Sequence, residues 1–410
     1  MSQALARRLG TGDAITVGLS AMIGAGVFAV WGPAASVAGR GLLIGLGIAA
    51  VIALCNAVAS AQLAQSYPSS GGTYLFGREV LGPWWGFLAG WGFVIGKTAS
   101  CAAMAMTFAA YAVPGNSLVQ RLLAVAAVAL LTVATLRGVT RTARVGQVLL
   151  GATLLVLALA IGLLSVADVA PASAATPVEG GMWGVLQSAG LLFFAFAGYA
   201  RIATLAEEVR RPEMLGRAIL VALGVAVATY AVIGWLVLAT LGDDLAGSTT
   251  PLADAVVAAG SGWASPLVRL GAAAAALGAL IALLAGVGRT SLAMARERDL
   301  PAPLAHVHPI HRIPDHAQLA IGVAVTALVL VADLRGAIGF SSCGVLVYYF
   351  VANLSALRQP AEARRWPRAL NLIGLIGCAV LVVTLPWTSL VAGGIVLGVG
   401  LLGRLLLRRG

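Results

Sequence analysis

Long apolar runs recur along the whole chain, and they set the strongest constraint on its fold. Residues 145–166 and 215–240 are each more than twenty residues long and contain at most one charge. An α-helix needs about 20 mostly apolar residues to cross the hydrocarbon core of a bilayer. Because these runs are apolar on all sides rather than in alternation, they predict membrane-spanning helices and not a β-barrel.

The scarcity of charge supports the same interpretation. Hydrophobic residues make up 60% of the 410 residues and charged residues only 10%, against about 25% in a soluble domain. A soluble chain of this composition could not cover its surface with polar groups. We therefore predict an all-α polytopic membrane protein with about twelve transmembrane helices, at 13–38, 41–66, 82–112, 120–136, 144–167, 182–206, 215–241, 264–290, 317–333, 336–357, 368–386 and 388–405.

The basic residues are distributed unevenly between the loops that these helices define. Of the 26 basic residues, 20 fall in the two terminal segments and the loops on the same side, and 4 fall on the opposite side. Such an excess marks the cytoplasmic side. We therefore expect a multi-pass protein of the bacterial cytoplasmic membrane with both termini in the cytoplasm. No basic stripe lies in a soluble region, so the bilayer is an expected partner and nucleic acid is not.

Several patterns resemble cofactor or metal sites but lack the required context. The four cysteines lie far apart in apolar runs and form no CxxC pair. The four histidines fall between 306 and 316 in a proline-rich segment that predicts an irregular loop, so we expect no metal. Residues 398–403 fit GxGxxG inside a predicted helix, without the strand that this pattern needs. We expect no cofactor, no catalytic residue and a single membrane domain over 1–410.

Two predicted helices carry glycines where a break would lie near the middle of the bilayer. The first holds Gly24 and Gly26, and the sixth holds Gly198. Glycine is about 1 kcal/mol worse than alanine in a helix, so local unwinding is favoured. Transporters built from inverted repeats place such breaks at corresponding positions of their halves, and these two breaks are five helices apart. The alternative is that the glycines only allow close helix packing.

Two basic residues lie within the predicted helices. Lys97, the sole lysine, is near the middle of the third helix, where a lysine costs about 2.5–3.5 kcal/mol. We interpret it as facing a cavity in a coupling or carboxylate-binding role, with a side chain that reaches the interface as the alternative. Arg201 lies in the inner half of the sixth helix, where function and simple pairing are equally favoured. We expect Glu207 and Glu208 to belong to an inner gate, with a solvated helix end as the alternative.

Five segments, taken together, resemble a known family. They are 12–28, which leads into IGAGVF; 67–74, YPSSGGTY; 193–199, FFAFAGY; 202–212, IATLAEEVRRP; and 295–301, ARERDLP. In this order and on these helices they resemble the amino acid–polyamine–organocation (APC) transporter superfamily, particularly its bacterial cationic-amino-acid-transporter-like members. The resemblance extends over most of the chain.

The resemblance implies a LeuT-like fold, with a 5+5 inverted repeat over 13–167 and 182–357 and two accessory helices within 368–408. It implies a permease that moves amino acids or related amines by alternating access, as an antiporter or a symporter, and we expect a monomer or weak dimer. Helices one, two, six and seven would move against three, four, eight and nine. The substrate's carboxylate would meet backbone N–H groups and its amino group would meet carbonyls, through Ile23, Gly24, Ala25, Gly26, Phe196, Ala197, Gly198 and Tyr199.

Two positions depart from the family's pattern. Ala200 stands where many relatives carry an acidic residue, which argues against a strictly cationic substrate. Thr153 stands where some proton-coupled relatives carry a lysine, so coupling through that residue does not carry over and proton coupling stays open. A carrier or exchanger of polyamines or other organocations is the first alternative. A membrane-embedded enzyme and a channel are less favoured, because acidic residues and histidines form no catalytic cluster at a membrane surface.

Overall fold

The computed structural model describes residues 10–67, 72–138, 143–167, 180–199 and 214–409, and every regular element in these ranges is a helix. The α-helices are α1 (Thr11–Met22), α2 (Gly26–Ala29), α3 (Trp31–Ala38), α4 (Leu42–Ser66), α5 (Gly72–Leu81), α6 (Pro83–Ala112), α7 (Ser117–Leu136), α8 (Ala143–Ser165), α9 (Gly181–Phe196), α11 (Leu215–Leu241), α12 (Pro251–Ala258), α13 (Ser265–Arg296), α14 (Asp315–Val331), α15 (Leu334–Arg358), α16 (Arg368–Thr384) and α17 (Trp387–Arg409). Short 3₁₀ turns, among them η6 (Ala361–Ala363), lie in the connections.

The chain is a multi-pass membrane protein. Nine segments of the described ranges are long and apolar enough to cross a membrane, and the shorter apolar helices α9, α14 and α16 add to them. Each of the twelve expected helices has a counterpart, so the all-helical prediction is confirmed, although the sixth is described only to residue 199. Helices α5 and α12 were not expected, because each is a short helix in a connection between two predicted membrane helices.

Local sequence accounts for several helix ends. Pro83 occupies the first turn of α6, where its missing N–H costs nothing. The Asn116 side chain accepts hydrogen bonds from two N–H groups in the first turn of α7, and the Asp333 side chain caps α15 in the same way. Gly242, with φ of +54°, ends α11 in a conformation that favours glycine.

The first membrane helix is broken, as its glycines predict. Helix α1 ends at Met22, and α2 begins at Gly26 after three residues outside any helix. Within this break the Gly24 N–H donates to the Met22 carbonyl at 2.9 Å. The sixth predicted helix leaves helical geometry at the expected position, because α9 ends at Phe196 and residues 197–199 form a turn.

Helices α6 and α15 approach each other backbone to backbone. A Cβ atom on Gly344 of α15 would lie 2.8 Å from the Gly96 Cα of α6, and one on Gly96 would lie 2.9 Å from the Ser341 carbonyl oxygen. Beside this contact the Ser100 and Ser341 hydroxyls are 2.7 Å apart and share a hydrogen bond. Close packing of this kind favours a rigid pair, because small residues bring whole backbones into contact.

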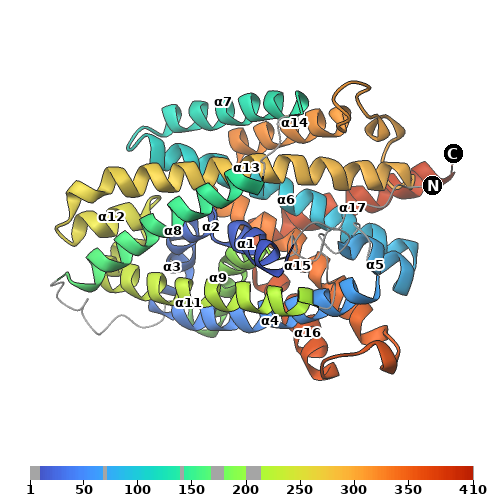
Figure 1. The fold of residues 1–410 in the computed structure, drawn as a ribbon, viewed down its shortest axis with the longest axis horizontal. Coiled ribbons are helices and arrows are strands. Elements are labelled where there is room, and N and C mark those ends of the chain that lie inside the picture. The colour runs from blue at the N-terminus through green and yellow to red at the C-terminus, as the bar shows by residue number, and fades with distance from the viewer. Residues whose placement is uncertain (1–9, 68–71, 139–142, 168–179, 200–213, 410) are drawn as a thin grey trace.

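These contacts define the arrangement in Figure 1. Helix α13 runs through the middle of the view beside α6, with α7 and α14 along one edge. Helices α4, α11 and α16 lie toward the opposite edge, and the broken segment α1–α2 lies between the two groups with α9. Helix α5 and the ends of α13 and α17 meet at one end of the molecule.

We predict that Gly344→Val weakens the contact between α6 and α15. The added side chain meets backbone that cannot move away, so stability should fall by about 1–3 kcal/mol or more, measured by thermal unfolding in detergent. Gly394→Val in α17 is the matched control, because a Cβ atom at that position would have no neighbouring heavy atom within 4 Å in the described structure. Equal melting temperatures for the two variants would contradict the packing argument.

Candidate functional site

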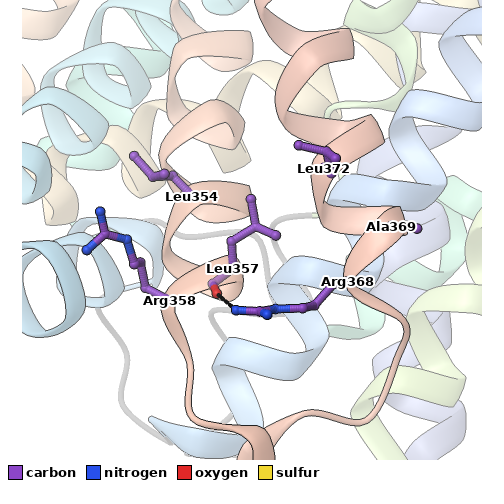
Figure 2. Close-up of a pocket in the computed structure, with 6 residues that line it drawn as sticks. All are labelled: Leu354, Leu357, Arg358, Arg368, Ala369 and Leu372. Carbon is purple, nitrogen blue, oxygen red and sulfur yellow. Dashed lines mark hydrogen bonds between the residues drawn. The ribbon is translucent and has the colours of Figure 1, made fainter.

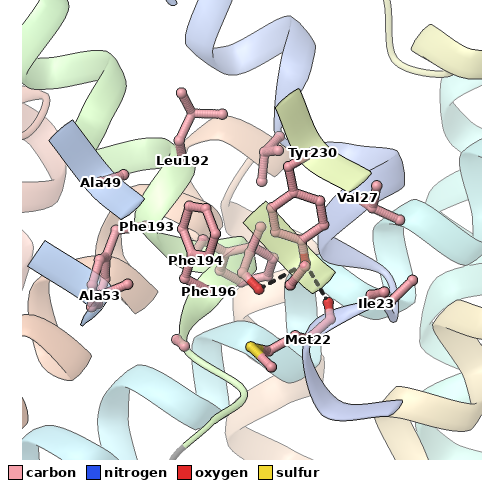
Figure 3. Close-up of a cluster of buried hydrophobic side chains, with 14 of the residues drawn as sticks. Met22, Ile23, Val27, Ala49, Ala53, Leu192, Phe193, Phe194, Phe196 and Tyr230 are labelled. Atoms are coloured by element: carbon pink, nitrogen blue, oxygen red, sulfur yellow. Dashed lines mark hydrogen bonds between the residues drawn. The ribbon is translucent and has the colours of Figure 1, made fainter. Parts of the chain in front are cut away.

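The two broken helices meet at their breaks. A Cβ on Gly26 would lie 2.9 Å from the Ala195 Cα, and one on Gly198 would overlap the Ala21 carbonyl group. Both positions therefore need glycine for the backbones to approach. Figure 3 shows Met22, Ile23 and Val27 of the first break beside Phe194 and Phe196 of α9. The predicted site segments 23–26 and 196–199 thus lie in one place, and their described side chains are buried.

Tyr230 of α11 links the two breaks. Its hydroxyl lies 2.7 Å from the Met22 carbonyl oxygen and 3.1 Å from that of Ala195, the two dashed lines in Figure 3. A hydroxyl has one proton, so it donates to one carbonyl at a time. The Tyr230 ring packs on Phe196 with centroids 5.0 Å apart. In the sequence this tyrosine is marked only as a single aromatic hydroxyl inside an apolar helix.

The first break exposes few backbone donors. The Gly24 N–H donates to the Met22 carbonyl. It is therefore not free for a substrate carboxylate, contrary to what the family resemblance had implied for this residue. The N–H groups of Ala25 and Gly26 have no acceptor among the described residues. Such groups at the start of a helical segment carry partial positive charge and favour an anionic group.

Lys97 points into the second break. Its side chain is buried in α6, and its ammonium donates to the Ala197 carbonyl oxygen at 3.1 Å. This carbonyl belongs to the turn that follows α9. No carboxylate in the described ranges forms an ion pair with Lys97. The ammonium has three donors, and this bond occupies one of them.

The two predicted aromatic residues lie in different surroundings. Phe196 is buried against Tyr230, beside the break. Tyr199 instead stacks on Tyr349 of α15, with ring centroids 4.9 Å apart. Of the two, Phe196 is therefore the one placed to contact a molecule at the break.

Several predicted residues lie outside the described ranges. Arg201 and the inner-gate pair Glu207 and Glu208 belong to this group, as does Ala200. Their roles stay predictions.

A charge network that the sequence did not reveal joins the ends of three helices. The Asp299 carboxylate is fully buried and pairs with Arg404 at 2.8 Å, Arg78 at 3.0 Å and Arg408 at 3.3 Å. It also accepts a hydrogen bond from the Tyr74 hydroxyl at 2.8 Å. Burial, and then this hydrogen bond, raise the pKa of Tyr74 above its ordinary value, so the hydroxyl stays protonated. The segments 67–74 and 295–301, quoted separately from the sequence, thus meet here.

The histidine-bearing loop is more ordered than the sequence predicts. The His306 Nδ1 lies at hydrogen-bond distance from an Asp315 carboxylate oxygen, 2.7 Å, and the His306 and His316 rings stack with centroids 4.4 Å apart. The ligand atoms of these three residues lie within 4.8 Å of one another, although the side chains are mostly exposed. This loop lies far along the chain from both breaks and shares no described contact with Lys97.

A multi-pass helical chain with two broken membrane helices in contact has the architecture of a membrane transporter. The sequence profile of the amino acid permease family matches residues 9–402. The chain therefore belongs to this family, within the APC superfamily, and the resemblance found in the five segments is confirmed. It is a family of transporters and not of enzymes.

Curated relatives agree with this assignment. An uncharacterized transporter of Mycobacterium tuberculosis is 52% identical over 399 residues, which is 97% of this chain and 90% of the relative. A branched-chain amino acid permease of Bacillus subtilis is 26% identical over 95% of this chain and 90% of its own length. The human cationic amino acid transporter 4 is 28% identical over 86% of this chain and 60% of its own length.

We predict that Asp299→Asn destabilises the protein. Three guanidinium groups would lose their shared buried carboxylate, which typically costs about 3–5 kcal/mol, measured as a shift in thermal or detergent-induced unfolding. Glu297→Gln is the control, because Glu297 pairs with Arg78 at 2.9 Å but is 53% exposed, and such pairs contribute about 0–1 kcal/mol. Similar losses in both variants would show that the buried carboxylate has no special role.

Proposed function

We propose that this chain is a secondary active transporter that carries amino acids or related amines across the cytoplasmic membrane by alternating access. The observation that carries the proposal is the contact between the two breaks, which leaves N–H donors at Ala25 and Gly26 close to the carbonyls of the second break. Family membership adds the expectation of a LeuT-like 5+5 repeat over 13–167 and 182–357, with accessory helices within 368–408.

The proposed site suits a molecule with both a carboxylate and an ammonium. The carboxylate would bind at residues 23–26, where free N–H groups begin a helical segment. The ammonium would bind at carbonyls of residues 196–199, with Phe196 beside it. Since one pole needs donors and the other needs acceptors, a zwitterion satisfies both breaks at once. The names of the relatives include branched-chain and cationic amino acids, so they support the class of substrate and not one member of it.

Lys97 would act between the two poles. Its ammonium already occupies the Ala197 carbonyl, which is one of the expected acceptors for the substrate. We propose that substrate binding releases this bond and that the freed ammonium then contacts the carboxylate or exchanges a proton. Arg201, Glu207 and Glu208 keep their proposed roles in coupling and in the inner gate.

Specific contacts fit a division into moving and fixed helices. Tyr230 ties α11 to α1 and α9, three elements of the proposed moving group. Two hydrogen bonds instead cross from α6 in the fixed group to the broken helices, one from Lys97 to Ala197 and one from the Tyr111 hydroxyl to the Phe28 carbonyl at 3.0 Å. In alternating access the crossing bonds would break and re-form, while the Tyr230 bonds would persist.

Counterflow into liposomes that contain the purified protein tests the proposal. The liposomes are loaded with a mixture of unlabelled amino acids, and one labelled amino acid at a time is presented outside. Accumulation above empty liposomes would establish the carrier and name the substrate class. Folded protein that accumulates no amino acid, and then accumulates a labelled polyamine, would favour the organocation alternative. No accumulation of either class would overturn the proposal.

We predict that Lys97→Met abolishes or uncouples transport while the protein still folds. The loss should be at least about tenfold, because a buried hydrogen bond to a charged group is worth about 1.5–3 kcal/mol. Folding should survive, since an apolar side chain of similar length replaces a buried charge without a carboxylate partner. Counterflow at two pH values measures the effect.

Thr98→Val is the matched control for this variant. Within the described ranges its hydroxyl bonds only to the Val94 carbonyl of its own helix, at 2.7 Å. The control should transport at the wild-type rate. If Lys97→Met also keeps wild-type rate and pH dependence, the lysine is structural.

A further inference from the structure

A pocket with two arginines at its mouth lies between the ends of α15 and α16. It has a volume of about 420 Å³ and is lined by Leu354, Leu357, Arg358, Arg368, Ala369 and Leu372. Figure 2 shows the two arginines at the same level of the helices, with leucines of α15 and α16 above them. Arg358 is the last residue of α15 and Arg368 is the first of α16, so both lie where the apolar helices meet the polar connection.

The mouth of this pocket carries unbalanced positive charge. Neither Arg358 nor Arg368 forms an ion pair with any carboxylate in the part of the chain that the structure describes. The Arg368 guanidinium donates only to the Leu357 carbonyl oxygen, at 3.5 Å. The connection between the helices adds Arg364 and Arg365 against one acidic residue. The mouth therefore favours an anionic occupant.

The wall of the pocket is apolar and continues down one stripe of α16. Ala369 lines the pocket, and Ile373, Ile376 and Val380 follow it at helical spacing. These three residues line a second pocket of about 660 Å³, which α16 forms with isoleucines of α4. From Ala369 to Val380 the helix rises about 16 Å, close to half of the 30 Å hydrocarbon core. The apolar track therefore has the length of one lipid acyl chain.

We infer that this surface is a binding site for an anionic phospholipid. Its phosphate would lie at Arg358 and Arg368, and an acyl chain would follow the stripe from Ala369 toward Val380. A soluble phosphate compound would leave the apolar track unused. A zwitterionic lipid has no net charge and would leave both guanidinium charges uncompensated, whereas a singly anionic lipid compensates one of them. The site goes beyond the proposed transport function, because it lies on the outer surface of α15 and α16 and does not include either break. The site lies at the arginine-rich side of the protein, which we expect to face the cytoplasm. Anionic lipids of the cytoplasmic leaflet attract basic residues at that surface.

Lipid binding to the purified protein in an uncharged detergent tests the inference. Native mass spectrometry would compare long-chain phosphatidylglycerol with phosphatidylcholine of the same chains, and thermal unfolding would be followed with each lipid. We expect phosphatidylglycerol to bind more tightly and to raise the melting temperature more. The double variant Arg358→Gln with Arg368→Gln should lose roughly 30-fold in affinity for phosphatidylglycerol, from two basic contacts.

A control variant with the same loss of charge separates the site from general electrostatics. Arg296→Gln with Arg312→Gln removes two arginines that neither line the pocket nor lie in the connection between α15 and α16, and it should bind phosphatidylglycerol as the wild type does. Equal losses in the two double variants would overturn the inference, as would equal binding of the two lipids. If the test variant does not fold, the single variants Arg358→Gln and Arg368→Gln should each show an intermediate loss.

Chain length and a soluble competitor test the lipid assignment itself. Long-chain phosphatidylglycerol should bind at least about tenfold more tightly than the eight-carbon form, since each buried CH₂ adds about 0.8 kcal/mol. Ile376→Asn should reduce that difference. Glycerol 3-phosphate should not displace the long-chain lipid at millimolar concentration. Displacement by it, or equal binding of both chain lengths, would show a phosphate site without an acyl track and would overturn the inference. Each readout is binding, so the outcome does not depend on transport.

Discussion

The contact between the two broken helices is the interaction on which the rest of this structure depends. In a bilayer a backbone polar group without a partner costs several kcal/mol, so a break has to be surrounded by donors and acceptors. Gly26 and Gly198 let the two breaks come together. Two donors then come from other helices: the Tyr230 hydroxyl, whose one proton reaches the Met22 or the Ala195 carbonyl, and the Lys97 ammonium, which donates to the Ala197 carbonyl. What remains unsatisfied is small and specific, which is the condition for a selective binding site.

Rigid and adjustable contacts are separated in space. Helices α6 and α15 meet through glycine and serine, with their backbones in contact. The broken helices touch α6 through single side-chain hydrogen bonds from Lys97 and Tyr111. A change in the second kind of contact costs far less than a change in the first, so the motion that we propose would take place at the boundary between the two groups.

The membrane helices and both breaks could be predicted from the sequence, because bilayer thickness fixes helix length and paired glycines mark unwinding. The partners of the breaks could not. Tyr230 and Asp299 look ordinary in the sequence, and their roles come from residues more than thirty and more than one hundred positions away. The sequence also did not show that Gly24, which we expected to be a free donor, uses its N–H to close a turn onto Met22. The local sequence pattern thus identifies where a helix is broken, and only the three-dimensional fold shows which side chains bind the backbone groups at the break.

The buried ammonium of Lys97 also shapes the electrostatic potential of the empty carrier. It bonds to a neutral carbonyl and has no described carboxylate beside it, so its charge is not cancelled locally. In surroundings of low dielectric constant such a charge acts over several ångströms with little screening. An approaching carboxylate therefore gains energy before any contact forms, and a second ammonium loses it. At the proposed site, the electrostatic potential would thus discriminate between substrates by charge before their shape matters.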